Sequence, residues 1–294
     1  MLLKGTELLD IANENGFAVP AFNISSHSML NAVMEVCEEK NSPHIIAIHP
    51  DELAHIGENF IPAVIQAAYR SPVPTMIHLD HGATYEQVQL AIHCGFTSVM
   101  IDGSLLPYEE NIALTKKVVE AAHAIGIQVE AELGTIGKTE NYDEKGTNDI
   151  IYTEPDVAKD FLEKTGADSL AVAIGTRHGL YPDDLQPELK IDLLRTIKET
   201  VKVPLVLHGG SNNPDNEIAK AVDGGINKIN ISSDIKAAYF LRMRDVLTDM
   251  KLREPNAIEP PCEEALKECA AQKDRKSTRL NSSHITRSRM PSSA

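Results

Sequence analysis

Eight short runs of valine, isoleucine, leucine and alanine recur along the chain and alternate with stretches of helical pattern. Most runs are continuously apolar, which is typical of strands buried on both faces. They cover residues 18–24, 44–49, 75–81, 98–102, 128–134, 169–175, 204–209 and 228–232. Helical patterns lie at residues 29–39, 85–94, 110–124, 154–165, 189–201 and 216–223, and several end at a glycine just before the next run. This alternation predicts an α/β protein with a parallel sheet.

Repetition of the strand–helix unit eight times favours a closed (β/α)8 barrel, the TIM barrel. A doubly wound open sheet is the alternative, but eight strands and the absence of a G-x-G-x-x-G turn after the first strand disfavour it. A length of 294 residues allows two domains, yet barrels of this kind commonly form one unit of about 200–250 residues. We therefore expect residues 1–272 to form a single barrel domain.

The composition changes sharply at Arg275. Residues 275–294 contain five basic residues, six serines and no acidic residue, and they lack apolar periodicity. Such a segment is typical of disorder, and it also resembles a translated adapter fragment. We expect this tail to be disordered or a sequence artefact, with a genuine basic tail as the alternative.

The net charge of −15 argues against nucleic acid and anionic membrane as partners. It leaves phosphorylated small molecules open, because backbone N–H groups can bind a phosphate without a net positive charge. No apolar stretch approaches the roughly 18 residues that a membrane span needs, and the first residues show no signal-peptide pattern. The four cysteines form no C-x-x-C pair. We expect a cytoplasmic protein with free thiols.

Polar side chains occur repeatedly at the ends of the predicted strands. Functional groups of (β/α)8 barrels lie at the C-terminal ends of the strands, so these side chains should share one rim. They are Asn23, Asp80, His81, Asp102, Glu132, His178, His208 and the segment Asn230–Ser233. So many polar residues at equivalent positions predict a functional site there.

Three of these residues, His81, His178 and His208, are distant in sequence but converge if the barrel closes. Three imidazoles with an open fourth position suit a catalytic Zn²⁺ ion. A single histidine is more often a core or capping residue, and His27, His44, His55, His93 and His123 keep that interpretation. Three histidines at equivalent strand ends, with acidic residues beside them, favour a metal site.

The acidic residues of the same rim have several candidate roles. Asp102 and Glu132 could each bind a second metal or orient a ligand histidine, and a helix cap or a salt bridge is the simpler alternative. Asp80 directly precedes His81. Neighbours on a strand point to opposite sides, so both can serve one site only if the strand bends there. With such a bend, Asp80 lies where a proton donor is needed.

A phosphate site is indicated after the last two strands, which is its usual place in this fold. His208 is followed by Gly209, Gly210 and Ser211, and the final strand ends at Asn230–Ser233. Glycine lets the backbone approach a ligand, and successive N–H groups can bind an anion. A long polar segment, residues 134–152, is typical of a lid. It carries Glu140, Asp143 and Glu144, one of which could serve as a general base.

The sequence resembles the class II, zinc-dependent ketose-bisphosphate aldolases over residues 1 to about 272. The resemblance rests on PAFN near the start, HLDHG at 78–82, EAELG at 130–134, SLAVAIGTRHG at 169–179, PLVLHGGS at 204–211 and KINI at 228–231. Together, in this order and spacing, these motifs are highly specific. The resemblance implies an α/β TIM barrel and a carbon–carbon lyase of carbohydrate metabolism and glycolysis. It also implies a homo-oligomer, either a dimer or a tetramer.

The resemblance implies reversible cleavage of a ketose phosphate, such as fructose or tagatose 1,6-bisphosphate, to dihydroxyacetone phosphate and an aldehyde such as glyceraldehyde 3-phosphate. His81, His178 and His208 would bind zinc, and Asp102 and Glu132 match positions associated with a second divalent metal. A monovalent cation near the phosphate is a further cofactor of the family.

Catalytic and substrate-binding roles are likewise implied. Asp80 would be the proton donor to the C4 oxygen, and Glu140 would be the family's loop carboxylate, the proposed carbanion base. The positions that match the dihydroxyacetone phosphate site are Gly179, Gly209, Gly210, Ser211, Asn230, Ile231, Ser232 and Ser233.

Three positions depart from the family pattern. His49 stands where many members have a small residue such as serine, the loop reads G-K-T-E, and Asn212-Asn213 follow Ser211. These departures leave the metal chemistry intact and put the aldehyde in question. Two alternatives stay open: a zinc hydrolase on the same barrel, which typically has an H-x-H pair where Asn23 stands, and a non-catalytic phosphosugar-binding protein.

Overall fold

Eight parallel strands close into a barrel in this computed structural model, which describes residues 1–138, 150–179, 188–211 and 213–278. The strand order around the barrel is β1-β10-β9-β7-β5-β4-β3-β2, and every pair in it is parallel. The strands are β1 (Val19–Asn23), β2 (His44–Ile48), β3 (Thr75–Gly82), β4 (Ser98–Ile101), β5 (Gln128–Leu133), β7 (Ser169–Val172), β9 (Leu205–Leu207) and β10 (Ile226–Ile231). Each predicted run overlaps one of these strands, so the TIM-barrel prediction is confirmed.

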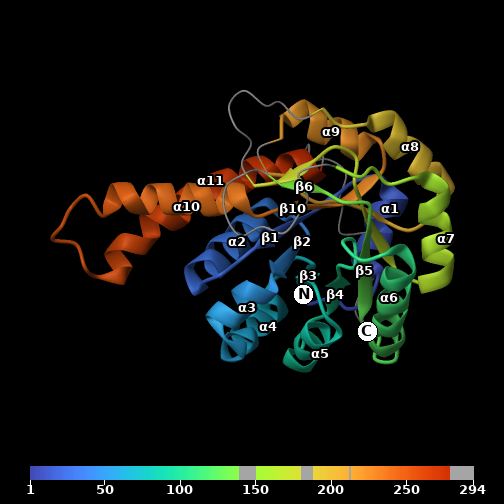
Figure 1. Cartoon of the computed structure of the whole chain (residues 1–294). Helices are drawn as coiled ribbons and strands as arrows, with labels where there is room; N and C mark the ends of the chain where they lie inside the picture. Colours follow the sequence, from blue (N-terminus) through green and yellow to red (C-terminus); the bar gives the residue numbers. More distant parts are fainter. Residues whose placement is uncertain (139–149, 180–187, 212, 279–294) are drawn as a thin grey trace.

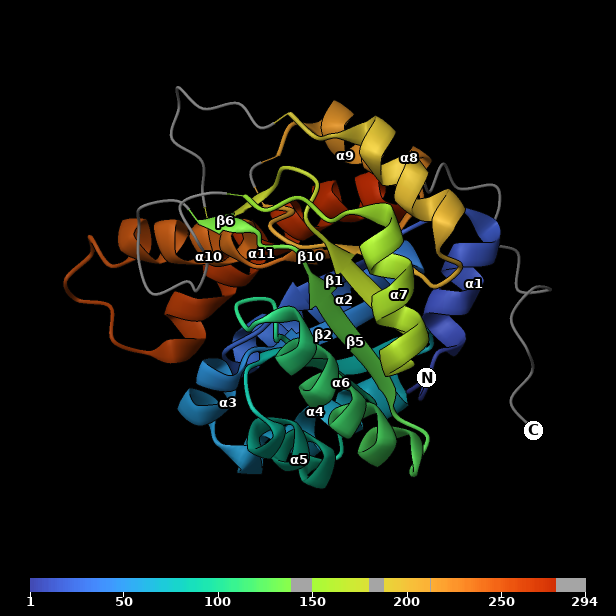
Figure 2. The same ribbon diagram turned by 45° about the vertical axis from the view of Figure 1, so that its right-hand side comes forward.

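Helices surround the barrel on its outside (Figures 1 and 2). They are α1 (Glu7–Asn15), α2 (His27–Lys40), α3 (Pro50–Ile56), η1 (Glu58–Phe60), α4 (Ile61–Arg70), α5 (Tyr85–Cys94), α6 (Tyr108–His123), α7 (Pro155–Thr165), α8 (Ile191–Thr200), α9 (Asp215–Asp223), α10 (Ser233–Val246) and α11 (Pro255–Thr278). The six predicted helical patterns correspond to α2 and α5–α9. A small additional pairing joins β6 (Gly137–Lys138) to β8 (Arg177–His178).

The barrel interior has an apolar lower layer and a polar upper layer. Val19, Ala21, Ile45 and Met76 pack together in the lower layer, and α1 covers them with leucines that include Leu8. Because residues two apart on a strand share a face, the positions that follow them toward the strand ends also point inward. Asn23, two positions after Ala21, and His78, two positions after Met76, are polar, which places polar side chains in the upper half of the barrel, at its C-terminal end.

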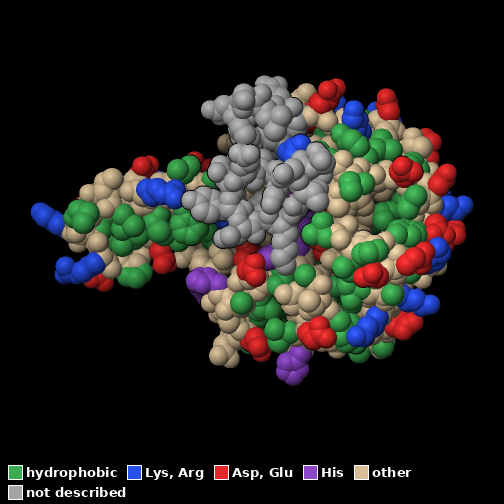
Figure 3. All heavy atoms as spheres, viewed as in Figure 1, with side chains coloured by type: hydrophobic (Ala, Val, Ile, Leu, Met, Phe, Trp, Pro, Cys, Tyr) green, Lys and Arg blue, Asp and Glu red, His purple; other side chains and the backbone are tan. Residues whose placement is uncertain are grey.

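The helices α10 and α11 extend beyond the barrel as a paired projection (Figure 1). We call the part that comprises residues 240–258 the arm. It exposes several large apolar side chains, including Phe240, Leu241, Leu247 and Met250, of which Met250 is 91% exposed. Apolar side chains are visible over this projection in Figure 3. Exposed apolar residues gathered on one projection are typical of an interface.

The helix α11 continues to Thr278, past the boundary that the composition places at residue 275. The expectation that residues 275–294 are disordered or a sequence artefact stays a prediction. Asp274 Oδ1 lies 2.5 Å from Ser42 Oγ, and this buried contact fixes the helix one residue before the boundary. A fixed helix propagates at low cost into the next turn. Residues 279–294 lie outside the described part of the chain.

None of the described helices combines the length and the hydrophobicity that crossing a membrane requires. The cytoplasmic location expected from the sequence stays a prediction.

Candidate active site

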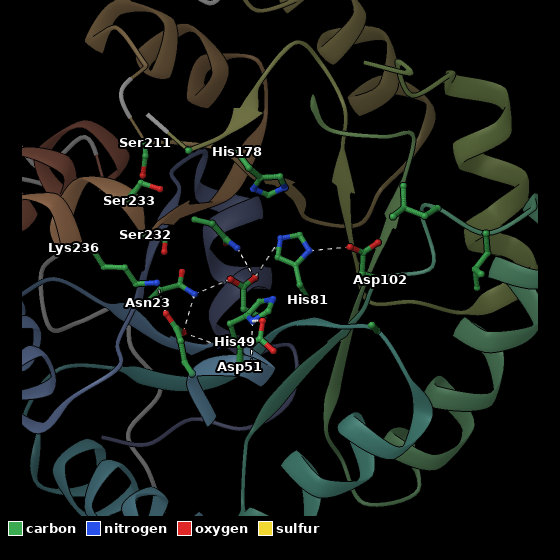
Figure 4. Close-up of a pocket in the computed structure, with 18 residues that line it drawn as sticks. Asn23, His49, Asp51, His81, Asp102, His178, Ser211, Ser232, Ser233 and Lys236 are labelled. Carbon is green, nitrogen blue, oxygen red and sulfur yellow. Dashed lines mark hydrogen bonds and ion pairs between the residues drawn. The ribbon is translucent and has the colours of Figure 1, made fainter. Parts of the chain in front are cut away.

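A cavity of about 540 Å³ opens at the C-terminal ends of the barrel strands. Its position agrees with the rim predicted from the strand ends. The described residues that line it are Asn23, His49, Asp51, Glu52, Asp80, His81, Ala83, Asp102, Leu105, Leu106, His178, Gly179, Gly209, Ser211, Asn230, Ser232, Ser233 and Lys236. Figure 4 shows Asn23, His49, His81 and His178 around a common space.

The backbone bends at His81, which has a φ of +53°. The register between β3 and β4 shifts in the same place, between Leu79 and Gly82. A non-glycine residue in the left-handed region is uncommon, and such strain is found where a site needs it. The bend brings Asp80 and His81 to the same cavity although they are adjacent in sequence, as the sequence analysis required.

His81, His178 and His208 converge in this cavity. Each offers one ring nitrogen to a group whose members all lie within 4.8 Å of one another. His81 Nε2 and His208 Nδ1 are 2.7 Å apart, and the ring centroids of His81 and His178 are 5.1 Å apart. Burial, with His81 and His208, lowers the pKa of His178 to about 3 and keeps its ring neutral. The structure thus brings together the three predicted metal ligands.

Two of these rings contact a carboxylate through the nitrogen that does not face the other histidines. His81 Nδ1 lies 3.0 Å from Asp102, and His208 Nε2 lies 2.8 Å from Glu130. The 2.7 Å distance between His81 Nε2 and His208 Nδ1 requires a proton or a cation between them, because with both rings neutral and donating to their carboxylates the two lone pairs would face each other. Facing lone pairs repel, and a cation shared by the two nitrogens removes the repulsion. The donor set, three imidazoles with carboxylates behind them, therefore fits a divalent metal such as zinc.

The electrostatics of His81 support the same conclusion. Burial lowers the pKa of His81, but Asp80 and the hydrogen-bonded Asp102 outweigh burial, and the result is a pKa of about 10. The pocket therefore favours a positive charge at this position.

A buried ionic network lies beneath His208. Lys228 Nζ is 2.8 Å from Glu130 and 3.2 Å from His78 Nε2, and none of these side chains is exposed. Burial raises the pKa of Glu130, but Lys228 and His208 more than compensate, so the net pKa is below the ordinary value. Glu130, Lys228 and His78 were not among the predicted site residues. The sequence contained a signal for them, because each lies two positions before a predicted site residue on the same strand. The pairs are His78 and Asp80, Glu130 and Glu132, and Lys228 and Asn230.

Asp80 is held by two amides. Asn23 Nδ2 donates to one carboxylate oxygen at 2.8 Å, and Asn230 Nδ2 donates to the other at 2.7 Å. Burial alone would raise the pKa of Asp80, but the nearby His81, His208 and Lys228 hold it well below its usual value. Asp80 is therefore an ionised carboxylate in a fixed orientation, 4.0 Å from His81 Nε2.

A second group of candidate ligands consists of His81, Asp102 and Glu132. Glu132 Oε2 is buried and has no hydrogen-bond partner among the described residues. Burial and the nearby Asp102 raise the pKa of Glu132 well above its ordinary value. This group could hold a second cation, whereas the Asp102–His81 contact also fits the orienting role that the sequence left open for Asp102.

The turn after β9 and the segment after β10 lie where the sequence predicts a phosphate site. Gly209 has a φ of +61°, and a Cβ on Gly210 would lie 2.6 Å from Ile229 Cγ2, so glycine is needed at both. The helix α10 begins at Ser233 beside this turn, and the N-terminus of a helix is a common position for an anion. The hydroxyl of Ser211 accepts from Asp234 N at 3.3 Å and ties the turn to the helix.

The other predicted site residues fall into three cases. Gly179, Ser232 and Ser233 line the cavity with Ser211 and Asn230. Gly210 and Ile231 do not line it, and the Ile231 side chain is buried in the core, which leaves only its backbone groups for a ligand. Glu140, the predicted loop base, lies outside the described residues.

The sequence matches the family described as fructose-bisphosphate aldolase class-II over residues 4–282. A fructose-bisphosphate aldolase of Thermus caldophilus is 39% identical over 290 residues, which cover 91% of this chain and 95% of the relative. One from Staphylococcus aureus is 40% identical over 272 residues, which cover 91% of this chain and 94% of the relative.

The chain belongs to the class II fructose-bisphosphate aldolase family. The crystal structure of the YdjI aldolase from Escherichia coli K12 is similar to this aldolase, with a TM-score of 0.83 and 34% sequence identity, covering 94% of this chain and 97% of the other. As a member of the family, the aldolase is a carbon–carbon lyase of carbohydrate metabolism. This membership decides against the two alternatives that the sequence had left open, a zinc hydrolase and a non-catalytic phosphosugar-binding protein.

Proposed function

We propose that this aldolase is zinc-dependent and reversibly cleaves a ketose phosphate to dihydroxyacetone phosphate and an aldehyde. The observation that carries the proposal is the convergence of three ring nitrogens within 4.8 Å beside an ionised Asp80. The names of the relatives support fructose 1,6-bisphosphate as a candidate substrate. Tagatose 1,6-bisphosphate is a second candidate, from the resemblance alone.

His81, His178 and His208 would hold Zn²⁺, which when bound supplies Lewis-acid stabilisation of the negative charge of the enediolate. Asp102 and Glu130 would fix the orientation of two of the rings through their outer nitrogens. His81, Asp102 and Glu132 offer a position for a second divalent cation. The monovalent cation stays a prediction from the resemblance.

Proton transfer falls to Asp80. In cleavage, its carboxylate accepts the proton of the C4 hydroxyl, the C3–C4 bond breaks, and the bonding electrons pass to the enediolate. In condensation, Asp80 returns the proton to the oxygen of the aldehyde. The amides of Asn23 and Asn230 orient the carboxylate in both directions. Glu140 is proposed as the group that exchanges the carbanion proton.

The backbone turn at Gly209–Ser211 and the start of α10 at Ser232 and Ser233 would bind the phosphate of dihydroxyacetone phosphate. Anchoring this phosphate places the three-carbon unit beside the histidines. The cavity walls exclude bulk water from the reactive carbanion.

The direct test is carbon–carbon bond formation. Zinc-loaded protein is mixed with dihydroxyacetone phosphate and a panel of aldehydes, with and without a chelator, and the product ketose phosphate is quantified. We expect product with at least one aldehyde, loss of at least about 100-fold of the rate on chelation, and recovery when zinc is added back. Failure to form product with every aldehyde, or full activity in the chelator, would contradict the proposal.

We also propose a homo-oligomer assembled through the arm, because it exposes Leu241 and Met250 away from the barrel. Leu241→Glu combined with Met250→Glu is expected to lower the molecular mass in size-exclusion chromatography with light scattering. The matched control is Ile125→Glu, since Ile125 is 57% exposed and Leu241 is 58% exposed. A wild-type monomer, or an unchanged mass in the double variant, would refute the role of the arm.

A further inference from the structure

The cavity wall that follows β2 carries a histidine in a fixed orientation. His49 is the N-cap of α3, and its Nδ1 lies 3.1 Å from the backbone N–H of Asp51. The Glu52 carboxylate accepts in return from the backbone N–H of His49, at 2.8 Å. Nδ1 also lies 3.5 Å from Asp51 Oδ2, but its shorter contact is with a backbone N–H, which can only donate, so we take Nδ1 as the acceptor and place the ring proton on Nε2. His49 therefore presents an N–H donor whose direction the helix start determines.

This donor belongs to the active-site cavity. The ring centroid of His49 is 6.3 Å from that of His81, and Figure 4 shows the two rings next to each other. No hydrogen-bond acceptor for Nε2 is found among the described residues, and the side chain is 27% exposed. Burial lowers the pKa of His49, which keeps the ring neutral. A neutral donor is thus available to a ligand.

The charges of this wall are negative. Asp51 follows His49 into the cavity lining with 83% of its side chain exposed. Lys236 is the one lysine or arginine among the described lining residues, and it forms an ion pair with Glu52. An anion bound in the described cavity away from the glycine turn and the start of α10 would therefore be repelled by Asp51. Among the described lining residues, no unpaired lysine or arginine would offset this repulsion.

We propose that His49 and Asp51 select the aldehyde, and that the site prefers a neutral aldehyde with a hydroxyl group beside its carbonyl over a phosphorylated one. This inference rests on the proposed function, because it assumes that dihydroxyacetone phosphate takes the glycine turn. His49 Nε2–H donates to the hydroxyl oxygen of the aldehyde, and Asp51 repels a second phosphate. The preferred ketose is then a monophosphate.

The role of Asp51 is tested with glyceraldehyde and glyceraldehyde 3-phosphate as the aldehydes that react with dihydroxyacetone phosphate. We expect a higher kcat/KM for glyceraldehyde in the wild type. Asp51→Asn should raise kcat/KM for the phosphorylated aldehyde about fivefold at low ionic strength and change that for glyceraldehyde less than about twofold. The control is Glu14→Gln, which removes an exposed acid on α1, outside the cavity.

The hydrogen-bond part is tested with His49→Asn. Asparagine is a good N-cap, so α3 keeps its start, but its shorter side chain does not reach the ligand position. We expect kcat/KM to fall about tenfold for glycolaldehyde, which has the hydroxyl, and less than about twofold for acetaldehyde, which lacks it. Circular dichroism and thermal unfolding verify that the variant is folded.

Equal losses for glycolaldehyde and acetaldehyde in His49→Asn would overturn the role of His49. A wild-type preference for glyceraldehyde 3-phosphate, or no selective gain in Asp51→Asn, would overturn the role of Asp51. Both results are distinguishable from failure of the proposed function, in which dihydroxyacetone phosphate reacts with no aldehyde at all.

Discussion

Asp80→Ala is expected to lower kcat about 10²- to 10⁴-fold, the usual contribution of a positioned general acid–base group. The variant should still bind zinc, because Asp102 and Glu130 hold the rings of His81 and His208 without help from Asp80. Asp80→Asn should lose as much turnover, since the amide keeps the shape but cannot carry the proton. The measurements are steady-state kinetics and metal content by mass spectrometry.

Loss of zinc from Asp80→Ala would show that Asp80 holds the metal site rather than transferring a proton. Asn23 and Asn230 lose their shared acceptor in the alanine variant. The asparagine variant separates that effect, because it can still accept a hydrogen bond. Full turnover in Asp80→Asn would contradict the catalytic role.

Lys228→Met is expected to lower the free energy of unfolding by about 3–5 kcal/mol, because it leaves a buried carboxylate, Glu130, without its cation. The measurement is urea denaturation of the chelated protein, so that metal binding does not contribute to stability. Lys116→Met, at an exposed position of α6, is the matched control and should change stability by less than about 0.5 kcal/mol.

The double variant with Glu130→Gln tests the cause. Glutamine carries no charge, so the double variant should regain part of the stability that Lys228→Met loses. A loss below about 1 kcal/mol in Lys228→Met would mean that Glu130 becomes protonated at little cost. No recovery in the double variant would mean that packing, not charge, explains the loss.

The barrel and its rim could be predicted from the sequence because both depend on local patterns. Continuous apolar runs fix the strands, and the fold then places His178 and His208 at one end without any knowledge of contacts. The helix α11 was missed because Pro260 and Pro261 lie inside it, and proline normally argues against a helix interior. The contact at Asp274, which extends this helix, also depends on tertiary packing.

The parts of the site that could not be predicted depend on which strands face each other. Glu130 on β5 and Lys228 on β10 belong to strands that are not neighbours in the barrel, so their contact follows from the closed geometry and not from strand pairing. The capping interaction of His49 likewise requires the start of α3, a helix too short to give a clear periodic pattern. The sequence could not predict the bend at His81. Strict alternation along a strand would point Asp80 and His81 to opposite sides, so a shared site was predicted only on the condition that the strand bends.

The left-handed turn at His81 has a consequence for how the enzyme can diverge. The proposed proton carrier Asp80 and the proposed metal ligand His81 are consecutive residues, so one peptide bond joins them and sets their spacing covalently. Gly82, just after the turn, has no space for a methyl group, because a Cβ there would lie 2.6 Å from the carbonyl oxygen of Met100. Insertions or bulkier residues at this point would displace both functions together. We therefore expect changes in aldehyde preference to accumulate at His49 and Asp51, between β2 and α3, while residues 80–82 stay fixed.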